Sequence, residues 1–194
     1  MKKEIPITIA STLLVIFICS IIGLLCVRNV VLDKFIDNIV LAKCVTEEYK
    51  FTDNKKIKFV NLKTQDDKAD IWLSYIKNAT TQTAILYSHG ALNHMGYNED
   101  LYEQFKDHCT FIMYDYRGYG KSSGVSTEES IQNDVMTVYN YVVNKLDILP
   151  QNLILYGKSL GVYPTLFLAN AAHGSNRLKL SVKAEIVFFI GHPF

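Results

Sequence analysis

Short and almost continuous apolar runs recur from about residue 56 onward and predict β-strands. The runs TAILYS, TFIMY and LILY do not alternate apolar with polar residues, which is typical of strands buried on both faces of a sheet. They are also rich in β-branched and aromatic residues, which strands favour. The predicted strands are Lys56–Leu62, Asp70–Ile76, Thr83–His89, Cys109–Asp115, Asn152–Gly157 and Ala184–Ile190.

Between the later runs the apolar residues recur at three- and four-residue spacing, which predicts helices. The clearest helix is Thr127–Asp147, and Ser126-Thr127-Glu128-Glu129 has the pattern of a capping box at its start. Two further helices are expected at Glu99–His108 and Leu160–Ala172. Because strands and helices alternate, the predicted fold class is α/β, with a mostly parallel sheet covered by helices.

A different pattern precedes this region and predicts a membrane anchor. The stretch Ile5–Val27 is 23 residues long and contains no Asp, Glu, Lys or Arg, whereas a helix needs about 20 residues to cross a bilayer. A cleaved signal peptide is the competing interpretation, but CVRNVV matches its cleavage site poorly. Lysines and arginines flank both ends, so the orientation and the membrane stay open. The predicted organisation is an anchor over residues 1–28, a connector over 29–50 and one domain over 51–194.

Composition and charge narrow the classes of partner. The 194 residues are 49% hydrophobic and 20% charged, which is sufficient for one globular domain with an attachment. The net charge is +1, and acidic and basic residues are interleaved, so we expect no nucleic-acid partner. The four cysteines lack the C-x-x-C spacing of a zinc site, and no metal site is predicted.

The tripeptide Gly-Lys-Ser occurs twice, at residues 120–122 and 157–159, and raises the question of nucleotide binding. A phosphate-binding loop has the form G-x-x-x-x-G-K-[ST], because the first glycine lets the backbone curl around the phosphates. At that position the two copies have Asp115 and Asn152 instead. The spacing of Gly118 and Gly120 also fails to continue into a dinucleotide-binding motif. We therefore expect no nucleotide partner.

The second copy is part of another motif. Gly157-Lys158-Ser159-Leu160-Gly161 has the form G-x-S-x-G and lies between a predicted strand and a predicted helix. At such a corner the backbone is strained, the serine hydroxyl projects from the turn, and the N–H of the following residue is available to an oxyanion. Ser159 is therefore a candidate nucleophile, and Leu160 is a candidate oxyanion donor.

Three segments together resemble successive blocks of the alpha/beta-hydrolase superfamily: Ile85–Gly96, Phe111–Gly124 and Leu153–Ala169. The chain is most similar to a branch of membrane-associated serine hydrolases that includes protein depalmitoylases and lysophospholipid or monoacylglycerol lipases. The resemblance covers roughly Lys56–Phe194. It implies that Ser159 is the nucleophile, that the backbone N–H groups of Leu160 and Ala91 bind the oxyanion, and that His89 is structural. It also implies a membrane lipid or acylated substrate and no cofactor.

The same resemblance implies an acid and a histidine base on loops after later strands. After Ser159 the sequence contains no Asp, one Glu (Glu185) and two histidines, His173 and His192. The acid and the base of the triad are therefore expected to be missing, as in a C-terminally truncated hydrolase. The function predicted from the sequence is a membrane-anchored serine hydrolase that acts on lipid esters or acyl thioesters. The alternative is a catalytically inactive, truncated hydrolase-like membrane protein that serves as a binding module or regulator.

Overall fold

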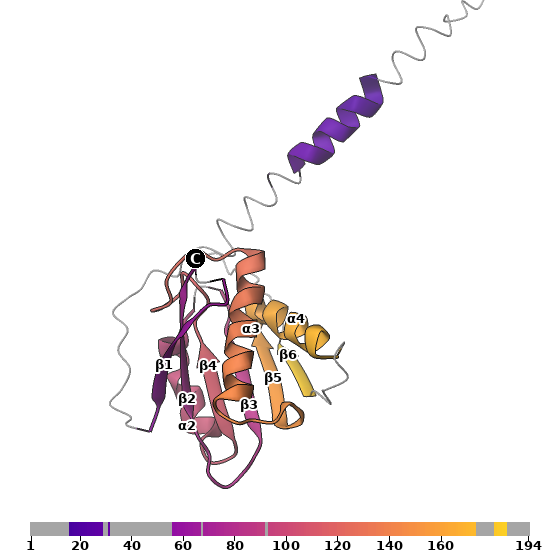
Figure 1. Cartoon of the computed structure of the whole chain (residues 1–194). Coiled ribbons are helices and arrows are strands. Elements are labelled where there is room, and N and C mark those ends of the chain that lie inside the picture. The colour runs from indigo at the N-terminus through magenta and orange to yellow at the C-terminus, as the bar shows by residue number, and fades with distance from the viewer. Residues whose placement is uncertain are drawn as a thin grey trace, which may run out of the picture. The chain divides into compact units, whose positions relative to one another are not determined.

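The computed structural model describes residues 16–28, 31, 56–66, 68–91, 93–173 and 181–185. The chain divides into two compact units, Met1–Val40 and Leu41–Phe194. In the first unit, residues 16–28 form a helix (Figure 1). None of the helices within the described ranges has the length and the apolar character that crossing a membrane requires. Residues 5–15 of the predicted anchor lie outside those ranges, as does most of the predicted connector.

One mixed sheet forms the centre of the second unit (Figure 1). In the described part of the chain its strand order is β1-β2-β4-β3-β5-β6. The strands are β1 Lys58–Lys63, β2 Asp70–Ile76, β3 Ala84–Ser88, β4 Thr110–Tyr114, β5 Leu153–Lys158 and β6 Ser181–Glu185. The pairs β4–β3, β3–β5 and β5–β6 are parallel, whereas β1–β2 and β2–β4 are antiparallel. The link between β1 and β2 is too short for a crossover helix, so these strands form a hairpin.

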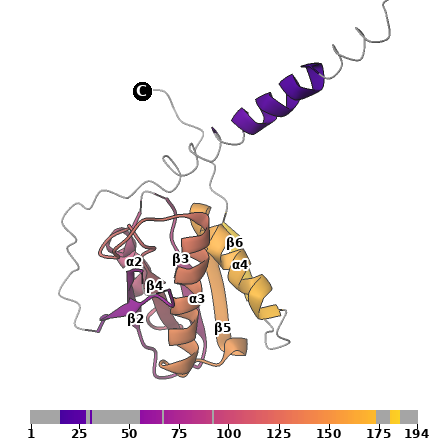
Figure 2. The ribbon, with the colours of Figure 1, turned by 45° about the horizontal axis from the view of Figure 1, so that its top comes forward.

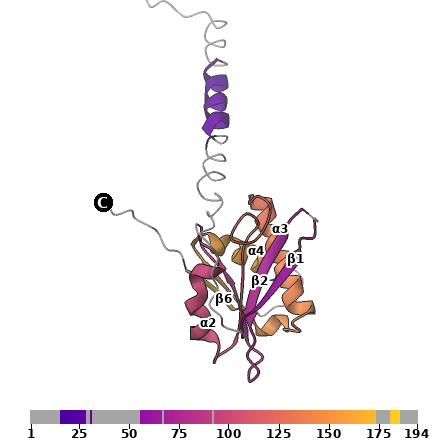
Figure 3. The ribbon, with the colours of Figure 1, turned by 90° about the vertical axis from the view of Figure 1, so that its left-hand side faces the viewer.

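Among the described residues, three helices cover this sheet: α2 Glu99–Phe105, α3 Glu128–Asn144 and α4 Val162–His173. Figure 3 shows α2 on one face and α3 with α4 on the other, and Figure 2 shows α3 and α4 side by side. Alternate strand residues divide between the two faces: Phe111 packs in the cluster that includes Tyr102 of α2, and Ile112 in the cluster that includes Val135 of α3. This arrangement confirms the predicted α/β fold and explains the continuous apolar runs, because both faces of β3 and β4 are buried.

One local prediction was wrong. The capping box of α3 consists of Thr127 and Ser130 rather than Ser126 and Glu129. The physical reason is that the Ser126 hydroxyl donates to the Arg117 carbonyl, 2.5 Å away, and is buried there. The strand β6 begins at Ser181, before the predicted start at Ala184, because its parallel pairing with β5 begins there, and Ala184 and Glu185 are in the strand as predicted. Residues 186–190 of that prediction lie outside the described part of the chain.

Candidate active site

A tight corner joins β5 to α4 and contains the serine singled out by the sequence. β5 ends at Lys158, a single 3-10 turn spans Ser159–Gly161, and α4 begins at Val162. Ser159 has φ 52°, in the left-handed region that residues with a Cβ rarely occupy. Its side chain is solvent-exposed, in contrast to the buried residues of the strand before it. The corner therefore presents a strained and accessible serine at the carboxyl end of a central strand.

The two glycines of the motif allow the backbones around this corner to pass very close to one another. A Cβ on Gly157 would lie 2.4 Å from the Gly161 carbonyl oxygen, and a Cβ on Gly161 would lie 1.9 Å from the Ser88 carbonyl oxygen. Neither distance is possible for a real side chain. Glycine is thus required at both positions because β5, the corner and the end of β3 are packed backbone to backbone.

Ser159 lies against the segment that follows β3. The parallel register pairs Ser88 with Gly157, so the residues after each strand emerge at the same edge of the sheet. A Cβ on Gly90 would lie 3.4 Å from Ser159 Cβ and 4.0 Å from Ser159 Oγ. Ala91, which follows Gly90, is half-buried, as is Leu160. The N–H of Leu160 lies in the first turn of a helix, where no acceptor exists within the helix itself.

The His89 side chain packs in the protein interior and does not face solvent. Its Nδ1 donates to the Gly90 carbonyl oxygen at 2.8 Å. The Nε2 atom lies 3.5 Å from Asp115 Oδ1, too far for a good hydrogen bond but within ion-pair range. The Tyr116 ring packs against the imidazole with ring centroids 4.4 Å apart. The imidazole is therefore part of the support for the segment after β3.

The loop with the first Gly-Lys-Ser is fastened to the sheet through Ser122. This buried hydroxyl donates to the Asp115 carbonyl oxygen at 2.7 Å and accepts from the Trp72 N–H at 2.9 Å. Backbone N–H groups of the same loop donate to carbonyl oxygens of the protein: that of Gly118 to Ser123, and that of Ser123 to Asp70. The motif thus closes a turn at the end of β4.

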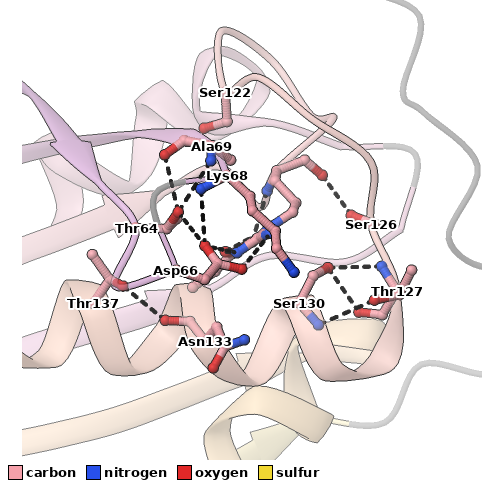
Figure 4. A network of polar contacts seen from close by, with 12 residues as sticks. Thr64, Asp66, Lys68, Ala69, Ser122, Ser126, Thr127, Ser130, Asn133 and Thr137 are labelled. Atoms are coloured by element: carbon pink, nitrogen blue, oxygen red, sulfur yellow. Dashed lines mark hydrogen bonds and ion pairs between the residues drawn. The ribbon is translucent and has the colours of Figure 1, made fainter.

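Arg117 and two aspartates attach the same loop to the rest of the unit. Figure 4 shows the surrounding network of polar contacts, with Asp66 beside Thr64. The guanidinium lies 2.7 Å from Asp134 on α3 and 3.2 Å from Asp66 in the β1–β2 turn. Burial raises the pKa of Asp134 despite the arginine. The Thr64 hydroxyl and Arg117 hold the pKa of Asp66 well below its ordinary value, because both donate hydrogen bonds to its carboxylate.

The structure brings the three predicted site residues, Ser159, Leu160 and Ala91, to one edge of the sheet. Of the residues considered for an acid or a base, His173 ends α4 and Glu185 ends β6, while His192 lies outside the described residues. Sequence reasoning missed the contacts of Asp115 and Tyr116 with the segment after β3. A surface hollow of about 370 Å³, lined by residues such as Gln82, lies at the opposite edge, where the parallel strands begin.

Comparison with known proteins gives the following similarities. No protein-family profile matches this chain. It is 34% identical over 88 residues to alpha/beta hydrolase domain-containing protein 17C of Xenopus tropicalis, which covers 44% of this chain and 28% of that protein. It is 30% identical over 125 residues to the protein named Uncharacterized protein R595 of Acanthamoeba polyphaga mimivirus, covering 62% of this chain and 42% of that protein. The chain thus matches less than half the length of these curated relatives.

Solved structures show the same architecture. An alpha-beta hydrolase from Vibrio vulnificus superposes with a TM-score of 0.64 at 22% identity, over 78% of this chain and 55% of that one. The esterase Pf2001 of Pyrococcus furiosus superposes with a TM-score of 0.57 at 16% identity, over 73% and 55% of the two chains. At these identities the likeness concerns the fold.

Proposed function

Because this chain belongs to the alpha/beta-hydrolase superfamily, we propose that it is a serine hydrolase with Ser159 as its nucleophile. The observation that carries the proposal is the exposed serine at φ 52° between β5 and α4, beside Gly90. A serine adopts such a sparsely populated backbone conformation only where the surrounding structure imposes it, which is common at functional sites. Presentation of the hydroxyl to a substrate would account for the conformation here.

In the proposed reaction, Ser159 Oγ attacks the carbonyl carbon of an acyl group. The hydroxyl proton passes to a base, and the carbonyl oxygen becomes an oxyanion that accepts hydrogen bonds from the N–H groups of Leu160 and Ala91. Loss of one such donor slows hydrolysis by about 10²–10³-fold in other serine hydrolases. The leaving alcohol or thiol departs with a proton, and water then hydrolyses the acyl-enzyme. We assign neither the base nor the acid to the described residues.

The proposed substrates are lipid esters or acyl thioesters presented at a membrane surface. The apolar stretch Ile5–Val27 supports this choice, because an anchor there would hold the domain at the bilayer where acyl chains are found. The proposal includes membrane localisation through that single N-terminal segment. The rival function is a hydrolase-like membrane protein without catalytic activity, which binds or regulates a partner.

Labelling with a fluorophosphonate probe tests the proposal on the protein expressed from its own complete transcript. We expect covalent labelling of the wild-type protein and its loss in Ser159→Ala. The matched control is Ser123→Ala, which removes an exposed serine beside the first Gly-Lys-Ser and should leave labelling unchanged. Labelling that persists in Ser159→Ala would refute the nucleophile. A folded wild-type protein that never labels would favour the inactive binding module.

A further inference from the structure

The proposed oxyanion donor Ala91 lies in irregular backbone between β3 and the 3-10 turn Met95–Asn98. Neither a helix nor a strand holds it, although an oxyanion hole works only when its donors are fixed before the reaction. The contacts that fix this segment must therefore come from elsewhere in the fold. Two of them come from the residues that follow β4.

Asp115 contacts both ends of the segment. Its Oδ1 accepts a hydrogen bond from the Met95 N–H at 2.7 Å, at the far end. The same oxygen lies 3.5 Å from Nε2 of His89, at the near end. The Asp115 side chain is fully buried, so water does not compete for these contacts. The hydrogen bond of this carboxylate is therefore to the far end of the segment, at Met95, and at the near end the carboxylate only lies beside His89.

Tyr116 adds a second attachment at the near end. Its hydroxyl donates to the His89 carbonyl oxygen at 2.7 Å, and its ring packs against the imidazole. Tyr116 is completely buried. The His89 carbonyl is two residues before Ala91, so this bond limits rotation of the peptide groups that lead to the proposed donor.

We propose that Asp115 and Tyr116 are positioning residues that hold His89 and Met95, on either side of Ala91, so that the Ala91 N–H faces the oxygen developing beside Ser159. This inference rests on the proposed function. Neither residue touches the substrate; both act through the backbone of the segment. The loop with the first Gly-Lys-Ser then helps to position Asp115. The Ser122 hydroxyl donates to the Asp115 carbonyl oxygen and keeps this aspartate in place.

Three variants test the inference: Asp115→Ala, Asp115→Asn and the milder Tyr116→Phe, which keeps the ring and removes only the hydroxyl. The control is Asp66→Asn, which removes a carboxylate that contacts Arg117 in the same loop, away from the segment. The first readout is amide hydrogen exchange across residues 89–98, which does not depend on catalysis. We expect exchange there to accelerate about tenfold or more in Asp115→Ala, less in Tyr116→Phe, and not in the control.

The second readout is turnover of a p-nitrophenyl acyl ester by the protein from its complete transcript, with active sites counted by titration. Because oxyanion contacts strengthen only in the transition state, kcat should fall about 10–100-fold in Asp115→Ala with KM nearly unchanged. Asp115→Asn should recover part of this loss, since its amide oxygen can still accept from the Met95 N–H. A merely structural role would lower the number of active sites but leave kcat per site unchanged.

The outcomes separate the two proposals. If exchange across residues 89–98 and kcat are unchanged in folded Asp115→Ala and Tyr116→Phe, the inference is wrong even when wild-type protein labels at Ser159. If exchange accelerates in these variants but wild-type protein neither labels nor turns over, the proposed function fails, whereas the attachment of the segment by Asp115 is supported.

Discussion

At the scale of single residues, the corner at Ser159 combines backbone strain with close backbone contact. The positive φ of Ser159 is unfavourable for a residue with a Cβ, and the packing around Gly157 and Gly161 leaves the corner no room to relax. Both features belong to the folded protein and can be tested by stability measurements that require no activity.

Gly161→Ala should destabilise the protein severely. The new Cβ would collide with the backbone carbonyl of Ser88, which cannot move without disturbing β3. We expect a loss of about 3 kcal/mol or more in the free energy of unfolding, measured by urea denaturation. Gly90→Ala is the control, since its Cβ would meet Ser159 Cβ at an ordinary 3.4 Å. Equal stability of the two variants would contradict the packing argument.

Replacement of the serine itself should reveal the strain. Ser159→Ala keeps a Cβ at φ 52°, whereas Ser159→Gly removes it. Relief of about 1–2 kcal/mol of left-handed strain, less the entropic cost of glycine of about 0.5–1 kcal/mol, should make the glycine variant more stable. Thermal and urea unfolding of the two variants, compared side by side, measure the difference. An alanine variant more stable than the glycine variant by about 0.5–1 kcal/mol would show that the corner is unstrained.

At the scale of elements, the start of α3 depends on the loop before it. Thr127 accepts from the Ser130 N–H, and the Ser130 hydroxyl accepts from the Thr127 N–H, so two helix-end donors are satisfied reciprocally. Ser126 is unavailable for this role because it is bonded to Arg117. The cap of α3 is therefore coupled to the position of the loop after β4.

Thr127→Ala should lower the free energy of unfolding by about 1 kcal/mol, because the Ser130 N–H loses its acceptor. Glu129→Ala is the discriminating control, since Glu129 is the residue that the sequence pattern placed in the capping box. It should cost less than half as much. Urea unfolding curves of both variants check the assignment, and a reversed order of stabilities would favour the sequence-based pairing.

At the scale of the whole hydrolase-like unit, Arg117 joins parts that are distant in the sequence. It connects the β1–β2 turn through Asp66 and α3 through Asp134 to the loop after β4. Because Asp66 has a lowered pKa in the folded state, its contribution to stability is present above its unfolded pKa of about 4 and is lost as the pH falls below that value.

Asp66→Asn should therefore reduce stability at pH 6 and matter progressively less as the pH is lowered from 4 to 2. Much of the opposite contribution of Asp134 cancels in the comparison with wild-type protein, because burial, the largest cause of its raised pKa, is common to both. Urea midpoints at several pH values measure the effect, with the exposed Asp107→Asn as control. A stability difference that stays constant from pH 6 to pH 2 would contradict the lowered pKa of Asp66.

Local pattern was sufficient for the α/β fold class and for the strand–turn–helix at Ser159. Strands buried on both faces require continuous apolar runs. The corner at G-x-S-x-G requires glycines, because the backbones there pass too closely for side chains. Each feature therefore restricts the residue types at neighbouring positions in the sequence. Which strands pair with one another in the sheet could not be predicted from local sequence in the same way. The antiparallel hairpin of β1 and β2 and the register of β6 depend on which strands become neighbours.

The contacts of Asp115, Tyr116 and Arg117 were likewise decided only by the tertiary structure. The hydrogen-bond partners of their side chains lie from 17 to 51 residues away in the chain, so no short motif around these residues could reveal them. The sequence by itself determined that Ser159 stands at a sharp turn, because that property is local. The tertiary structure decided what surrounds Ser159, because buried polar groups are satisfied by whichever partners the packed sheet and helices bring within reach.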